Sequence, residues 1–198
     1  MSRRSLPALA ILLLATTAFA QSHLPERHVG VAFPSGALSV GFSARDLADE
    51  SVRRALTSGL TKHFVLTVQV YPRASTTPFA TRQLSCAVTY DLWEEAFVVQ
   101  RGRRREVVPT VDAAIARCLV VQNVAIAEAS TLASRHGLDA YLAVRAEFNP
   151  ISGSACARSL RRPGGDDPLG PVVVNIVRRE ICQADRALQF RSQPFRVP

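Results

Sequence analysis

An alternating run of side chains at residues 64–71 constrains the fold of this chain more than any other feature. Phe64 and Leu66 begin one apolar face of an extended chain, whereas Thr67 belongs to the opposite, more polar face. A period of two is typical of a β-strand with one buried face. Pro72 follows the run and ends it, because proline has no N–H to donate to a sheet. We therefore predict a strand at this position.

Shorter runs of the same kind, separated by turn residues, predict a sheet around this strand. The other expected strands are 29–33 and 37–42, joined as a hairpin, then 83–90, 96–100, 106–108, 138–148, 172–177 and an edge strand within 188–197. The expected helices are one capped by Ser43 or Asp46 and ending near Ser58, one over 111–122, and one from about Ala125 to Gly137. Because strands outnumber helices and most connections are too short for parallel crossovers, the predicted fold class is α+β. We expect an antiparallel or mixed sheet with two or three helices packed on one face.

Residues 1–20 have the three parts of a secretory signal peptide. Arg3 and Arg4 supply the charged start, an apolar stretch follows, and Ala18 and Ala20 supply the small side chains that precede cleavage before Gln21. The apolar stretch is shorter than the ~20 residues that a transmembrane helix needs. We expect residues 21–198 to be a single exported globular domain in the periplasm or outside the cell, whether it leaves by the general or by the twin-arginine route.

The charge of the chain is basic and is carried almost entirely by arginine. The formal net charge is +8, it falls by two when Arg3 and Arg4 leave with the signal peptide, and Lys62 is the sole lysine. Arginine binds phosphate and carboxylate groups more specifically than lysine does. A basic surface attracts anionic partners, although a GC-rich genome would also enrich arginine.

Cys86, Cys118, Cys156 and Cys182 all lie in the predicted exported part. An even number of cysteines in an oxidising compartment predicts two disulfides, with three possible connectivities. We favour Cys156 with Cys182, because these two flank a turn rich in proline and glycine. Cys86 and Cys118 could equally be small buried apolar residues, since each continues the apolar face of its element.

Motifs of enzyme chemistry are missing from the sequence. We find no G-x-S-x-G, H-E-x-x-H, G-x-x-x-x-G-K-[ST] or G-x-G-x-x-G pattern. The four histidines show no metal-ligand spacing near the cysteines. We therefore expect no cofactor and no metal. Basic and aromatic residues do not interleave, so a nucleic-acid partner is not expected either.

A cationic loop between two apolar segments is the sharpest polar feature. It contains Arg101, Arg103, Arg104 and Arg105 around Gly102. Clustered guanidinium groups can hold the phosphates of lipopolysaccharide or of anionic lipid. The alternative is a solvated hairpin tip without a ligand.

A second cluster surrounds Trp93. Asp91, Glu94 and Glu95 could provide a pair of carboxylates beside an aromatic platform, the arrangement that glycosidases use. The alternative is a charged hairpin turn over a packed aromatic ring.

Two resemblances add to these expectations. The order of several segments resembles a domain-of-unknown-function family of small exported bacterial proteins; the segments are Arg45-Asp46-Leu47, residues 54–59, the strands that begin at Phe64 and Leu84, Thr110-Val111-Asp112, and residues 188–195. This family implies one exported domain and no particular chemistry. Residues 133–142 are similar to a helix-glycine-strand unit of the amino-terminal domain of some periplasmic envelope-assembly proteins.

We expect a non-enzymatic periplasmic or secreted binding or adaptor module of the cell envelope, which meets an anionic or protein partner through the cationic loop. The alternative function is a hydrolase of envelope polymers that uses the carboxylates near Trp93. An enzyme is the less expected of the two.

Overall fold

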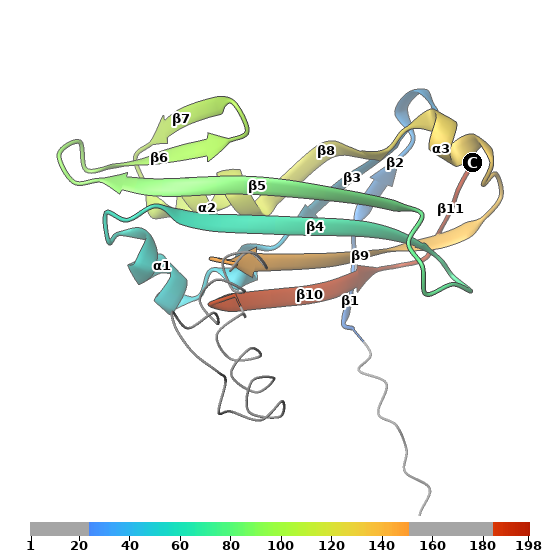
Figure 1. The fold of residues 1–198 in the computed structure, drawn as a ribbon, viewed down its shortest axis with the longest axis horizontal. Coiled ribbons are helices and arrows are strands. Elements are labelled where there is room, and N and C mark those ends of the chain that lie inside the picture. The colour runs from blue at the N-terminus through green and yellow to red at the C-terminus, as the bar shows by residue number, and fades with distance from the viewer. Residues whose placement is uncertain (1–23, 151–183) are drawn as a thin grey trace, which may run out of the picture.

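The computed structural model of the chain describes residues 24–150 and 184–198 (Figure 1). The predicted signal peptide, Cys156, Cys182 and the expected strand at 172–177 lie outside these ranges. The helices and short 3₁₀ turns are η1 Pro34–Gly36, η2 Arg45–Leu47, α1 Glu50–Leu56, α2 Val111–Leu119 and α3 Ala129–Ala133. The strands are β1 Glu26–Arg27, β2 Gly30–Ala32, β3 Leu38–Ser43, β4 Lys62–Pro72, β5 Ala80–Asp91, β6 Ala96–Arg101, β7 Arg104–Val108, β8 Val120–Ala127, β9 Asp139–Phe148, β10 Arg186–Ser192 and β11 Phe195–Arg196.

The predicted strand at 64–71 is confirmed and lies in the middle of the larger sheet. The order of this sheet is β1-β10-β9-β4-β5-β6-β7, and β11 adds to β9. The pairs are antiparallel except that β1 runs parallel to β10. Phe64, Leu66 and Val68 are at most 2% exposed, as the alternation predicts. The sheet is therefore built around the most regular pattern in the sequence.

A second, smaller sheet covers part of the first. Its order is β2-β3-β8. The predicted hairpin of residues 29–33 and 37–42 is confirmed, because β2 and β3 pair in antiparallel fashion. Phe42 of β3 meets Phe190 of β10 with ring centroids 5.7 Å apart. Buried residues of both sheets form one hydrophobic core. The expected mixed sheet is present as the larger of two sheets in the described chain, and the α+β class holds in the coarser sense of sheets with short helices.

The helices are shorter than the sequence indicates. The first predicted helix divides into η2 and α1, because the carboxylate of Asp49 accepts the N–H of Val52 at 3.0 Å and so caps α1 later than Ser43 or Asp46 would. Helix α2 is capped by Thr110 as expected. The predicted helix from Ala125 is wrong at its start, since β8 continues to Ala127 and pairs with β3. Tertiary pairing has overridden the local helical preference of this alanine-rich segment.

Candidate functional site

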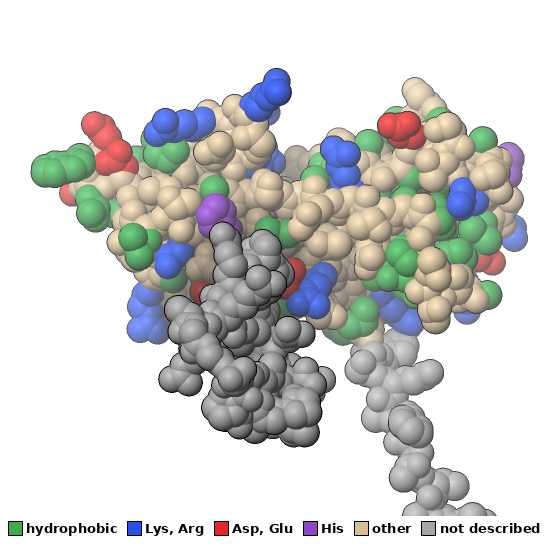
Figure 2. All heavy atoms as spheres, viewed as in Figure 1, with side chains coloured by type: hydrophobic (Ala, Val, Ile, Leu, Met, Phe, Trp, Pro, Cys, Tyr) green, Lys and Arg blue, Asp and Glu red, His purple; other side chains and the backbone are tan. Residues whose placement is uncertain are grey.

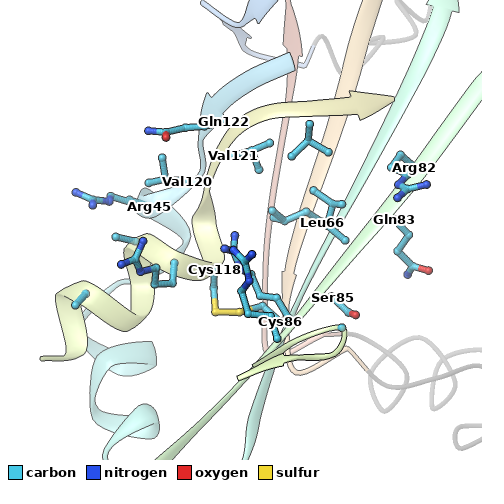
Figure 3. Close-up of a pocket in the computed structure, with 18 residues that line it drawn as sticks. Arg45, Leu66, Arg82, Gln83, Ser85, Cys86, Cys118, Val120, Val121 and Gln122 are labelled. Atoms are coloured by element: carbon cyan, nitrogen blue, oxygen red, sulfur yellow. A yellow bond between two sulfur atoms is a disulfide. The ribbon is translucent and has the colours of Figure 1, made fainter. Parts of the chain in front are cut away.

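A groove of about 860 Å³ opens between β5, β8, α2 and the β6–β7 hairpin (Figure 3). This volume lies within the range of typical ligand sites. One wall carries side chains of β5, the opposite wall carries Val120, Val121 and Gln122 of β8, and Cys86 and Cys118 join the two sides at one end. The groove thus lies where the two sheets come together.

Arginines from five elements line this groove. They are Arg45 of η2, Arg82 of β5, Arg101 of β6, Arg104 of β7 and Arg117 of α2. No aspartate or glutamate is among the lining residues. The rest of the lining is mostly apolar and includes Leu66, Leu84 and Val124. This combination of clustered cations and apolar surface fits an anionic ligand with an apolar part.

The β6–β7 hairpin separates the four predicted arginines into two pairs. Arg101 and Arg104 are directly opposite each other in the strand register, and both line the groove. Arg105 is opposite Gln100 and is therefore on the other face of the hairpin, because cross-strand neighbours share a face and successive residues alternate. Arg103 lies in the turn after Gly102, whose φ is +57°, and neither Arg103 nor Arg105 lines the groove.

Three groove arginines were missed at the sequence level: Arg45, Arg82 and Arg117. Arg82 shares a face of β5 with Leu84 and Cys86, so it continues a core-facing row of side chains at a position where the core opens into the groove. The sequence predicts a strand that begins at Gln83 and so places Arg82 in the preceding loop. The signal that could have identified Arg82 is its spacing: it lies two residues before Leu84 and four before Cys86, so it continues their alternation.

Most of the groove arginines have no ionic partner in the part of the chain that the structure describes. Arg117 pairs with Glu106 at 2.8 Å. The salt bridges among the described residues include none of the other four groove arginines. Arg101 and Arg104 are cross-strand neighbours, and like charges directly opposite each other repel. A bound anion would relieve this repulsion.

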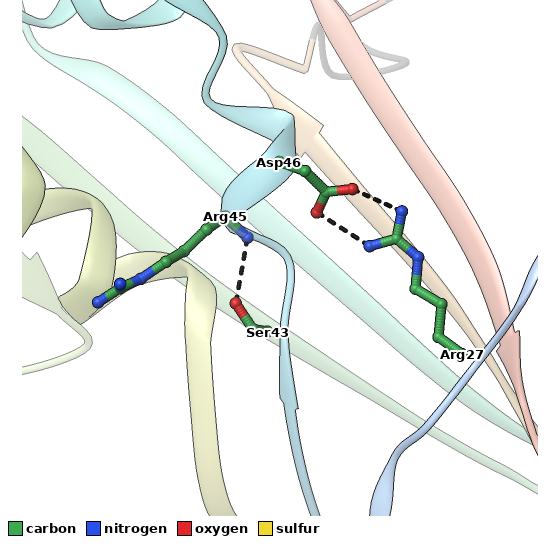
Figure 4. A network of polar contacts seen from close by, with 4 residues as sticks. All are labelled: Arg27, Ser43, Arg45 and Asp46. Carbon is green, nitrogen blue, oxygen red and sulfur yellow. Dashed lines mark hydrogen bonds and ion pairs between the residues drawn. The ribbon is translucent and has the colours of Figure 1, made fainter.

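Arg45 is positioned by a polar contact on the reverse side of η2. Asp46 accepts two hydrogen bonds from the guanidinium of Arg27, one of them 2.9 Å long, while Arg45 points the opposite way (Figure 4). These hydrogen bonds hold the pKa of Asp46 below its ordinary value. The ion pair therefore ties the N-terminal strand β1 to the short turn that presents Arg45 to the groove.

Replacing Asp46 by asparagine is expected to lower the free energy of unfolding at pH 7 by at most about 1 kcal/mol, because the pair is partly exposed. The lowered pKa in the folded state means that the stabilisation is present above the unfolded pKa of about 3.9 and is lost as the pH falls through the folded value. Urea denaturation should show the variant and the wild type converging below that window. Glu128→Gln, at an exposed acid, is the control. A difference between Asp46→Asn and wild type that persisted unchanged at low pH would contradict the prediction.

Cys86 of β5 and Cys118 of α2 form a disulfide, with their Cα atoms 5.5 Å apart. Both residues are also 5% exposed, so the buried and the bridged interpretations hold together. The favoured pair, Cys156 and Cys182, lies outside the described residues and stays a prediction. The observed bond joins β5 to α2, and both of its residues line the groove.

The carboxylates near Trp93 lie at the β5–β6 turn, away from the groove lining. Asp91 accepts the backbone N–H groups of Trp93 and Glu94, at 2.9 and 3.3 Å, and so shapes the turn. Trp93 is 94% exposed rather than packed under the turn. Figure 2 shows hydrophobic side chains projecting at this tip. The acidic cluster therefore forms a turn with an exposed ring.

The described residues form neither a metal site nor a membrane-spanning helix. No group of three or more histidine, cysteine, aspartate or glutamate side chains there is placed to hold a metal ion. Within residues 24–150 and 184–198, none of the helices has the length and apolar character required to cross a membrane.

The described residues thus form a small domain of two sheets, which contains a disulfide and a groove lined by arginines. The chain belongs to the family described as a domain of unknown function, DUF4390, whose model matches residues 27–150. This confirms the predicted membership of a family without assigned function, and the matched range contains every residue that lines the groove. No curated protein and no solved structure matches the chain.

Proposed function

We propose that this protein is a non-enzymatic binding module that holds an anionic partner in the arginine-lined groove. The observation that carries the proposal is the convergence of five arginines from separate elements on a groove whose lining contains no carboxylate. Guanidinium groups bind phosphate and carboxylate through paired hydrogen bonds. In this proposal the anion is bound by Arg101 and Arg104 of the cationic loop. Arg45, Arg82 and Arg117, from elsewhere in the fold, bind it with them.

The place of action that fits best is the periplasm or the cell exterior, with a partner in the cell envelope. The sequence of residues 1–20 supports export. The Cys86–Cys118 disulfide is compatible with it, because such bonds persist in oxidising compartments. Localisation of a carboxy-terminal fusion, with sequencing of the mature amino terminus, would test this part of the proposal.

A hydrolase is not favoured by an observation on the described residues. Asp91, Glu94 and Glu95 belong to a tight turn, and none of them is among the residues that line the groove. We therefore retain the binding function alone.

The β6–β7 hairpin offers a matched pair of variants to test the groove. Arg101→Glu with Arg104→Glu reverses the two arginines that line it, and Arg103→Glu with Arg105→Glu makes the same charge change on the same hairpin outside it. We expect the first variant to weaken binding of short-chain inorganic polyphosphate at least tenfold, because each lost guanidinium removes charge-assisted hydrogen bonds. The second should weaken it less than threefold through net charge alone.

Calorimetric titration at low and at physiological salt measures both variants against wild type. Circular dichroism melting would show that the two variants remain folded. Equal losses in the two variants would mean that polyphosphate binds by net charge and would overturn the groove as the site. Wild-type protein that does not bind polyphosphate at either salt concentration would overturn the proposed function.

A further inference from the structure

Strand β5 is longer than its partner on the side of the groove. It pairs with β4 over residues 80–88 but with β6 only over residues 87–91. Strand β6 ends at Arg101, and the chain turns back at Gly102 into β7. Within the described chain, residues 80–86 of β5 therefore present an unpaired strand edge to the groove.

Strand β8, across the groove, also has an unpaired edge. It pairs with β3 on one side, and the order β2-β3-β8 places it at the border of the smaller sheet among the described residues. An unpaired edge offers N–H and C=O groups to any extended chain that can reach it. The groove thus lies between two strand edges, where β6 would have continued had it been longer.

We infer that the groove binds an extended acidic polypeptide segment, which pairs with residues 80–86 of β5 as an added strand. This inference rests on the proposed function and names its ligand class. A polypeptide carries N–H and C=O groups at the spacing of a strand edge, and strand addition is a known mode of peptide recognition. Phosphate polymers carry charge without such groups.

The charge and length of the site specify the segment further. Seven residues of free edge span roughly 23 Å and offer three or four N–H and C=O pairs, because alternate residues of an antiparallel strand direct their hydrogen-bonding groups to the same edge. Side chains of an added strand alternate between two faces, so one set meets the arginines. That set also lies beside Leu84, which shares the face of Arg82, and the other set lies on the face of Gln83 and Ser85. A segment with acidic residues at alternate positions is therefore the expected ligand.

Arginines beside a strand edge have a second possible role, which is to prevent that edge from pairing with other chains. Under this alternative the charges protect β5 and no ligand is bound. The test must therefore separate pairing at the edge from attraction by charge.

The probe is a fluorescein-labelled peptide that alternates glutamate and valine, titrated into the purified protein and followed by fluorescence anisotropy. Its control has the same sequence with N-methylated amides on the hydrogen-bonding edge, which keeps the charge and removes the strand hydrogen bonds. We expect the parent peptide to bind, N-methylation to weaken binding at least tenfold, and Arg82→Glu to weaken it similarly. Hydrogen exchange should show that the parent peptide protects those amides of residues 80–86 that are directed to the groove rather than to β4.

The outcomes distinguish this inference from the proposed function. If polyphosphate binds in the groove while the parent and N-methylated peptides bind equally, the anion site stands and the strand addition is wrong. If polyphosphate binds and neither peptide does, the arginines protect the edge against polypeptides and the inference is again wrong. Protection of β8 instead of β5 would also overturn it.

Discussion

Replacing both Cys86 and Cys118 by alanine is expected to lower the free energy of unfolding by about 3–4 kcal/mol. The two residues are 32 positions apart. In the chain-entropy model, a bond that closes a loop of this size restricts the unfolded chain by that amount. The bond also joins β5 of the larger sheet to α2, and both cysteines line the groove, so its removal acts on the groove as well as on stability.

Guanidinium denaturation of the double variant and of wild type measures this loss. The single variant Cys86→Ala should be destabilised by a similar amount, because either substitution removes the same bond. Peptide mapping under non-reducing conditions should recover Cys86 linked to Cys118. A double variant within 1 kcal/mol of wild type, or Cys86 linked to another cysteine, would contradict the prediction.

Replacing Leu142 by alanine is expected to lower the free energy of unfolding by about 2–5 kcal/mol and the melting temperature by roughly 5–15 °C. Leu142 is 0% exposed on β9, which pairs with both β4 and β10. The backbone N–H of this residue also donates to the buried hydroxyl of Ser192 at 2.9 Å, which holds the strand in position. Truncation therefore leaves a cavity that the surrounding strands cannot readily close.

Leu60→Ala is the matched control for this prediction. Leu60 is 66% exposed, so the same truncation should change the free energy of unfolding by less than about 0.5 kcal/mol. Thermal and chemical denaturation of the two variants should differ accordingly. If both substitutions had the same effect, the central position of β9 in the core would be wrong.

The strands were predictable where one face is buried and the other is not. The alternation from Phe64 onward and that of residues 138–148 both correspond to strands of the larger sheet, because a period of two reports burial on one side. The segment after α2 was not predictable in this way. Its residues Val121 and Ile126 are both buried, but the strand is irregular where it pairs with β3, so its pattern lacks a clean period. The partner strand decides its conformation.

The candidate site could likewise be predicted only in part from the sequence. The cationic loop was visible as a run of arginines, but a run does not state which of its side chains face a groove. The cross-strand register assigns Arg101 and Arg104 to the groove and leaves Arg103 and Arg105 out of its lining. Arg45, Arg82 and Arg117 are far apart in the sequence, and no local pattern connects them.

The sequence by itself determined the period of the central strands, the excess of arginine and the resemblance to a family without assigned function, because each is a property of local order or composition. The tertiary structure alone decided that there are two sheets, that Cys86 bonds to Cys118, and that five arginines meet at one groove. Each of these depends on which distant segments pack together. That choice follows from the burial of a common core and is not written in any short stretch of the chain.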